Sequence, residues 1–174
     1  MNPTRLLLTT LLAGGSAAVA GCNDTTPLEV SRPAPAGDLL GGLGQLLTLL
    51  RCTPLPAAST SATIGSAGGT LQVGPHTLAI PAGALSGPVT ITATAPADNV
   101  NTVQFQPEGL VFAKPAALTM SYANCSTLGL LGPKRVVFTD DALAILEVLL
   151  SVDSRSSQTV VGRLQHFSHY AVAY

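Results

Sequence analysis

Residues 64 to 85 read IGSAGGTLQVGPHTLAIPAGAL, and this stretch decides the fold that we expect. Gly68-Gly69 indicates a turn, because glycine reaches positive φ without steric cost. After it, Leu71 and Val73 alternate with polar residues, a pattern typical of a half-buried strand. We therefore expect a strand to begin directly after the two glycines.

The second half of the stretch predicts a return strand. Gly74-Pro75 interrupts the first strand, and the alternation resumes at Leu78 and Ile80. Pro81 lacks a backbone donor and ends the pairing. The short turn that follows lets Leu85 lie under the sheet. The whole stretch predicts a β-hairpin followed by a tight turn.

The same two-residue alternation recurs along the rest of the chain. Strands are expected near residues 89–94, 103–105, 110–112, 118–122, 135–138, 159–161 and 163–174. The last of these is either two closing strands or one bent strand. Residues 124–134 read as a glycine-rich loop. Residues 142–151 suit a helix or a strand; we favour a strand that turns at 151–157 and pairs with 159–161. About eight or nine short strands predict an all-β, antiparallel β-sandwich.

Composition limits the class of protein. The 174 residues suffice for one domain with a core. Charged residues make up 10% and the net charge is −1, which argues against nucleic acid as a partner. The 17 glycines and 13 prolines fit strands joined by turns.

Residues 1–21 are expected to be a signal segment. Arg5 supplies the positive start, residues 6–13 are apolar, and the run ends in Val19-Ala20-Gly21-Cys22. Small residues before a cysteine resemble the bacterial lipobox, which implies a diacylglycerol on the Cys22 thiol and palmitate among its acyl chains. The alternative is an ordinary secretory signal cut near Ala20.

Residues 22–37 are rich in proline and poor in bulky apolar side chains, which predicts a flexible linker. Such a linker would hold the domain off the membrane to which the lipid attaches. Asn23 follows the cysteine where aspartate would suggest inner-membrane retention. We therefore expect an envelope location, outer membrane favoured over inner, with the domain facing the periplasm or the surface.

Residues 38–51 carry leucines at helical spacing, with Asp38 at the start and Arg51 at the end. They predict a short leucine-rich helix, despite glycines that weaken it. One interpretation docks its leucine face on the sandwich. The other makes it a membrane-surface or partner-binding helix, although a single cation argues against membrane binding.

Two cysteines remain if Cys22 is lipidated, Cys52 after the leucine-rich segment and Cys125 after an expected core strand. An even pair in an oxidising compartment predicts a disulfide between them. The bridge would attach the leucine-rich segment and its connector to the sandwich. The alternative is two unrelated thiols.

Enzyme chemistry has little support in the sequence. It holds no G-x-S-x-G motif, no phosphate-binding loop and no plausible pair of acids for hydrolysis. A metal site could be drawn from His166, His169 and His76 with Asp140 or Asp141. However, two histidines three apart on a strand point to opposite faces, so we expect no metal and no cofactor.

The chain resembles the ZU-five domain, a β-sandwich module of netrin receptors, zona occludens protein and ankyrins. The matching residues are Gly68-Gly69, the block Ile80 to Leu85, the run Pro107 to Phe112, Lys114-Pro115, and His166 to Tyr170. The resemblance covers about residues 62 to 174, within a domain that we place at 52–174. It implies protein–protein contacts and, in a few members, self-cleavage.

His166-Phe167-Ser168 resembles the triplet of the self-cleaving members. The resemblance implies that the Ser168 hydroxyl would attack the Phe167 carbonyl while His166 takes its proton. The alternative is a closing strand with Phe167 in the core. We expect a non-enzymatic, lipid-anchored envelope protein with a binding or structural role, its partner another envelope protein or a glycan. Self-cleavage between Phe167 and Ser168 is the alternative function.

Overall fold

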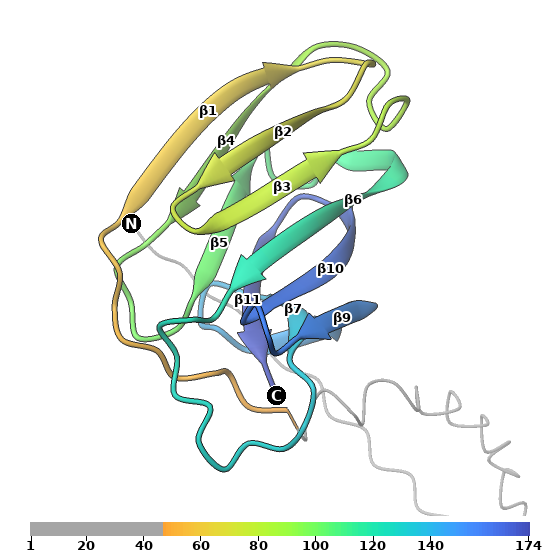
Figure 1. The fold of residues 1–174 in the computed structure, drawn as a ribbon. Coiled ribbons are helices and arrows are strands. Elements are labelled where there is room, and N and C mark those ends of the chain that lie inside the picture. Colours follow the sequence, from red (N-terminus) through yellow and green to blue (C-terminus); the bar gives the residue numbers. More distant parts are fainter. Residues whose placement is uncertain (1–46) are drawn as a thin grey trace, which may run out of the picture. The chain divides into compact units, whose positions relative to one another are not determined.

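The computed structural model describes residues 47–174, and their regular structure is entirely β-strand (Figure 1). The first sheet has the order β1-β4-β5-β11-β7-β8 and the second the order β2-β3-β6-β10-β9. All neighbouring strands within residues 47–174 pair antiparallel, and the two sheets form a β-sandwich, as the alternation predicted. The strands are β1 (Ala58–Ile64), β2 (Gly69–Val73), β3 (His76–Ile80), β4 (Val89–Ala95), β5 (Thr102–Gln106), β6 (Val111–Ser121), β7 (Arg135–Thr139), β8 (Ile145–Val148), β9 (Ser151–Ser154), β10 (Thr159–His166) and β11 (His169–Ala173).

The predicted hairpin is confirmed as β2 and β3, with Leu71 opposite Leu78. Gly68 before β2 has a φ of 75°, and a Cβ there would lie 2.4 Å from the Ile80 carbonyl oxygen. This position therefore requires glycine for both its conformation and its space. Leu85 is buried after the turn, as expected.

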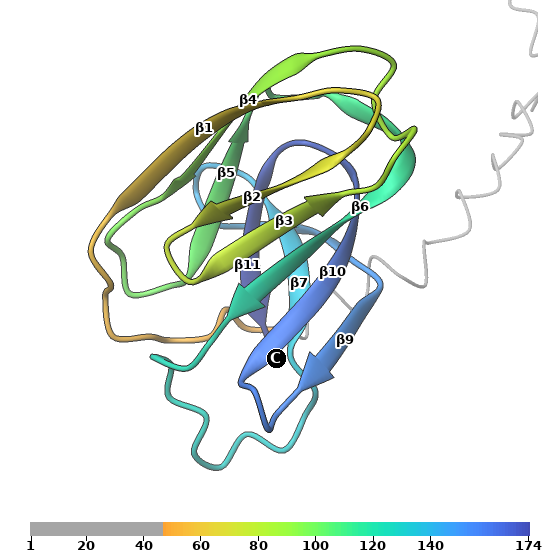
Figure 2. The same cartoon turned by 45° about the horizontal axis from the view of Figure 1, so that its top comes forward.

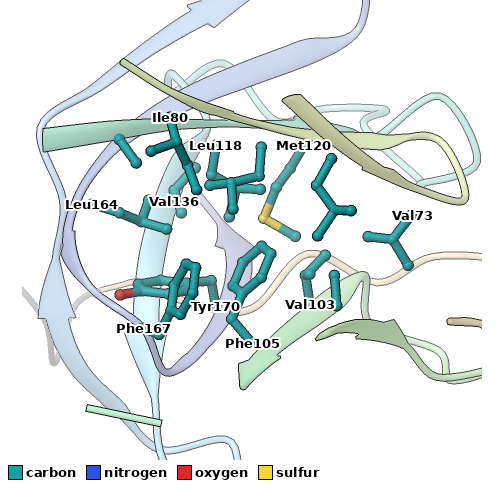
Figure 3. Close-up of a cluster of buried hydrophobic side chains, with 14 of the residues drawn as sticks. Val73, Ile80, Val103, Phe105, Leu118, Met120, Val136, Leu164, Phe167 and Tyr170 are labelled. Atoms are coloured by element: carbon teal, nitrogen blue, oxygen red, sulfur yellow. The ribbon is translucent and has the colours of Figure 1, made fainter. Parts of the chain in front are cut away.

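The core lies between the sheets and is built around aromatic rings from β5, β11 and the β10–β11 corner (Figure 3). Phe105 stacks on Phe167 with ring centroids 5.0 Å apart, and Tyr170 lies beside Phe105. Leu118 and Val136 close the layer from the two sheets, and both are fully buried. These residues occupy the inward positions that the alternation marks.

The two sheets lie in close contact at Gly162, where β10 of the second sheet packs against β7 of the first. A Cβ built on Gly162 would lie 2.6 Å from the Cβ of Val136, which belongs to the opposite sheet. Since real Cβ atoms do not come that close, glycine is needed for this contact between layers.

The outer face of the first sheet is polar and uncharged at its β1 edge, where β1 and β4 present serine and threonine side chains. Cross-strand hydroxyl pairs join the two strands there: Ser59 to Thr94 at 3.3 Å, Ser61 to Thr92 at 3.1 Å, and Thr63 to Thr90 at 3.0 Å. Such pairs stabilise neighbouring strands modestly.

The strand predicted over residues 142–151 is wrong in its extent and its partner. β8 pairs with β7, and β9 pairs with β10, so the chain changes sheets between them. The cause lies at Leu149, whose side chain enters the core, while the Ser151 hydroxyl donates to the Leu149 carbonyl. The turn that joins β9 to β10 consequently falls at residues 155–158, with Gln158 at a φ of 51°.

The predicted helix over residues 38–51 is wrong for the part that the structure describes. Residues 47–51 are extended: the Leu50 amide donates to the Val172 carbonyl at 2.8 Å, and Leu49 forms a β-bridge with Ala173. Leu50 is fully buried, so the compact domain includes residues before position 52. The segment pairs with the C-terminal end of β11, beyond the residues that pair with β5, and leucine spacing alone does not reveal that partner.

The signal segment 1–21, the lipidation site Cys22, the linker to residue 37 and residues 38–46 lie outside the described residues. Within residues 47–174 there is no helix with the length and apolar character needed to cross a membrane.

Candidate functional sites

The two cysteines expected to pair lie together in the structure. Their sulfur atoms are 2.07 Å apart, which is disulfide bonding distance. The backbones also meet there, because the Thr53 amide donates to the Asn124 carbonyl and the Ser126 amide donates to the Arg51 carbonyl. The pair joins the extended segment before β1 to the loop after β6, as predicted, although that segment is not helical.

Two asparagines next to the cysteine pair form a polar network that sequence reasoning missed. Asn101 Nδ2 donates to Asn124 Oδ1 at 2.7 Å, and Asn124 Nδ2 donates to Asn101 Oδ1 at 3.0 Å. Asn101 also donates to the Ser121 carbonyl, and Asn124 to the Thr53 carbonyl. All of these hydrogen bonds are made to atoms of the domain itself, which is typical of side chains that fix a loop. The only sequence signal for this network was the position of the two asparagines, Asn101 just before one strand and Asn124 shortly after another.

A second polar cluster holds the other end of the same loop. The Asp153 carboxylate accepts from the Tyr122 hydroxyl at 2.7 Å and from the Lys134 amide at 3.0 Å. Burial, together with the hydrogen bond to Asp153, raises the pKa of Tyr122 to about 12, so the phenol remains the donor at neutral pH. The sequence placed Asp153 in a turn, but β9 carries it against the loop.

The triplet His166-Phe167-Ser168 lies where the chain passes from β10 in the second sheet to β11 in the first. Of the two possibilities left open by the sequence, the structure shows two closing strands. Phe167 is fully buried against Phe105 and Phe112, and Ser168 is 4% exposed. Phe167 thus packs in the core, as expected from the alternative in which the triplet is part of the closing strands.

Tyr170 fixes this corner. Its hydroxyl donates to the His166 carbonyl at 2.5 Å, four residues earlier, which is the arrangement of a tyrosine corner in other sandwiches. Burial, and secondarily the charge of Glu147, raises the pKa of Tyr170 well above its ordinary value. The phenol therefore stays protonated and keeps donating.

The peptide between Phe167 and Ser168 is held by its neighbours. The Phe167 carbonyl oxygen accepts from the Gly109 amide at 3.0 Å, and His166 Nδ1 lies 3.4 Å from the same oxygen. His166 thus contacts the Phe167 carbonyl through Nδ1. The Gly109 amide donates to this oxygen, and His166 adds a second donor in the tautomer that protonates Nδ1. Such donors polarise the carbonyl, whereas self-cleavage also needs a base placed to accept the serine proton.

The three histidines occupy three different environments. His76 is buried on β3, where its Nδ1 accepts from the Ser121 amide at 3.2 Å, and burial lowers its pKa to about 4. His166 packs edge-on to Phe138, whereas His169 Nδ1 lies 2.9 Å from Asp141. Within the described range, histidine, cysteine and acidic side chains form no group of three or more suited to a metal.

A cleft of about 550 Å³ lies where the extended segment meets the outer face of the first sheet. Its lining is largely apolar and includes Leu47, Leu49, Val100, Leu143 and Ile145. The volume falls within the range of small-molecule sites, but the lining offers few polar groups to orient a ligand.

The class defined so far is an all-β, two-sheet sandwich with a cysteine pair at disulfide distance. Neither a family model nor a curated protein matches this chain.

Proposed function

We propose that this chain is a lipid-anchored cell-envelope protein whose sandwich has a binding or structural role and no catalytic one. The observation that carries the proposal is the cysteine pair. With Cys52 and Cys125 at disulfide distance, Cys22 is the odd cysteine of three, and it follows an apolar run and three small residues. A disulfide persists in an oxidising compartment such as the periplasm, where lipoproteins reside.

The use of the polar side chains supports a non-catalytic role. His76 is neutral and buried, Tyr122 and Tyr170 donate within the domain, and Ser168 is inaccessible. The apolar cleft beside Leu49 offers a contact surface instead. The partner we propose is another envelope protein or a glycan, with the membrane reached through the lipid.

We also propose a ZU-five-like domain. The resemblance is supported by the position of its residues: Gly68-Gly69 precede and begin β2, and Ile80 to Leu85 end β3 and form the turn after it. The triplet at the end of β10 lies at a sheet-to-sheet corner. A two-sheet sandwich is the architecture that the resemblance implies.

Metabolic labelling with palmitate tests the anchor. We expect wild-type protein to incorporate label and to partition with membranes, and Cys22→Ala to lose both. Replacing Cys52 and Cys125 together by alanine is the matched control, because it removes two thiols and should leave labelling unchanged. Equal labelling of wild type and Cys22→Ala would reject the lipid anchor.

Self-cleavage between Phe167 and Ser168 is the second candidate, favoured by the two groups that approach the Phe167 carbonyl oxygen. Against it, neither residue has positive φ, and the peptide between them is not cis. We expect purified wild type to remain one polypeptide under denaturing conditions. Two fragments from wild type, with Ser168→Ala intact, would make self-cleavage the leading function.

A further inference from the structure

Strand β1 is an open edge of the first sheet. Its only pairing partner in the part of the chain described is β4, with seven residue pairs in unbroken register from Ala58–Ala95 to Ile64–Val89. In both ribbon views β1 runs along the margin of the domain (Figures 1 and 2). One row of backbone N–H and C=O groups on β1 therefore has no partner strand, which makes it a template for another strand.

This edge lacks the devices that usually prevent pairing. Proteins protect edge strands with charges, prolines, bulges or short length. The opposite side of the sandwich has them: β8 carries Glu147 and adjoins a register shift, and β9 has four residues including Asp153. β1 has seven residues, no charge, no proline and no register shift.

The part of the sequence that contains β1 also carries little charge. Between positions 52 and 107, the only Asp, Glu, Lys or Arg is Asp98. β1 and its partner β4 themselves carry no charged side chain that would disfavour an approaching strand. The neighbouring edge of the second sheet, β2, is uncharged as well.

The sequence of β1 identifies the occupant. Residues 58 to 62 read ASTSA, which is the same in both directions around Thr60. A two-fold axis at Thr60 would place Ala58 opposite Ala62 of a second copy and Ser59 opposite Ser61. That pairing repeats the hydroxyl pairs that β1 already makes with β4, at 3.0 to 3.3 Å.

We propose that two copies of this chain pair edge to edge through β1, antiparallel about a two-fold axis at Thr60. The contact is isologous, so it closes after two copies and does not continue into a fibre. Backbone hydrogen bonds provide the attraction, and the small side chains let the strands meet without a clash. The interface is independent of the lipid anchor and of the partner proposed above.

Analytical ultracentrifugation of the full chain tests the proposal, with Cys22→Ser as background to exclude an intermolecular disulfide. We expect a dimer whose fraction rises with concentration. Ser61→Lys puts a charge beside the axis and should weaken the dimer about tenfold or more. Ser61→Thr at the same position and Val152→Lys on the opposite edge should dimerise like the parent.

Cysteine cross-linking tests the register. Directly opposed residues of antiparallel strands have Cα atoms about 4.5–5.5 Å apart, within reach of a disulfide. Thr60→Cys should therefore link two copies under mild oxidation, and Thr63→Cys should not. A chain that stays monomeric, a dimer that survives Ser61→Lys, loss of the dimer in Val152→Lys, or linkage at residue 63 in place of 60 would each overturn the proposal.

Discussion

Gly162→Ala should destabilise the sandwich by forcing its layers apart. The new Cβ would lie 2.6 Å from Val136 Cβ, 2.8 Å from its Cγ2 and 3.0 Å from its Cγ1. Carbon atoms in contact prefer about 3.5–4.0 Å, so β10 and β7 must separate by roughly 1 Å. Both strands lie inside their sheets, and Val136 is fully buried, so neither can move alone.

Overpacking of this kind costs about 1–3 kcal/mol. For a domain of this size each kcal/mol lowers Tm by about 4 °C. Urea unfolding followed by circular dichroism measures the change in the free energy of unfolding. Gly87→Ala is the control, because a Cβ there meets no atom within 4 Å and the change should stay within about 0.5 kcal/mol.

A double-mutant cycle isolates the contact. Val136→Ala alone removes two buried methyl groups and should cost about 2 kcal/mol. In the double variant the new methyl of residue 162 occupies the vacated space, so the two costs should not add. If the two free-energy costs add fully, the contact between residues 162 and 136 is not tight. A Gly162→Ala variant as stable as wild type would likewise refute the reasoning.

Other predictions concern stability and pH. Replacing Cys52 and Cys125 together by alanine should lower the free energy of unfolding by about 4 kcal/mol, because the bridge spans 73 residues; equal stability in non-reducing urea titrations would contradict this. His76, neutral when folded with a pKa of about 4, should make stability complete above pH 6.5 and fall as pH drops toward 4, by up to about 3 kcal/mol. His76→Gln, which can still accept from the Ser121 amide, should flatten that pH profile; an unchanged acid slope would contradict the assignment. Thr139→Val should raise stability by about 1 kcal/mol, measured the same way, because the Thr139 hydroxyl is buried without a hydrogen-bond partner; a loss of stability would contradict it.

The strands and the hairpin were predictable because one face of each strand is buried. Leu71, Val73, Leu78 and Ile80 alternate with more exposed residues in sequence and in the structure alike. A period of two is a local signal, so it does not depend on knowing the partner strand. The pairing of Cys52 with Cys125 was predictable for another reason. With Cys22 assigned to the lipid, these two cysteines remain in a compartment expected to be oxidising.

What failed depended on contacts distant in sequence. Leucines at helical spacing also suit an extended segment when a sheet edge is available, and residues 47–51 pair with β11 from the far end of the chain. The chain changes sheets at Leu149 because this side chain is buried in the core, and no local sequence pattern encodes that contact. Sequence reasoning likewise could not show that His166 would contact the Phe167 carbonyl, because side-chain direction at the corner is set by Tyr170 and Phe138.

The intact mass of the protein extracted from native envelopes, measured without reduction, tests the central claim most directly. We predict one species whose mass equals residues 22–174 plus a diacylglyceryl group and any further acyl chain on Cys22, less two hydrogens for the bond between Cys52 and Cys125. Alkylation before analysis should leave that mass unchanged, because no thiol is free. A chain without lipid, two alkylated thiols, or a fragment that begins at Ser168 would contradict the account.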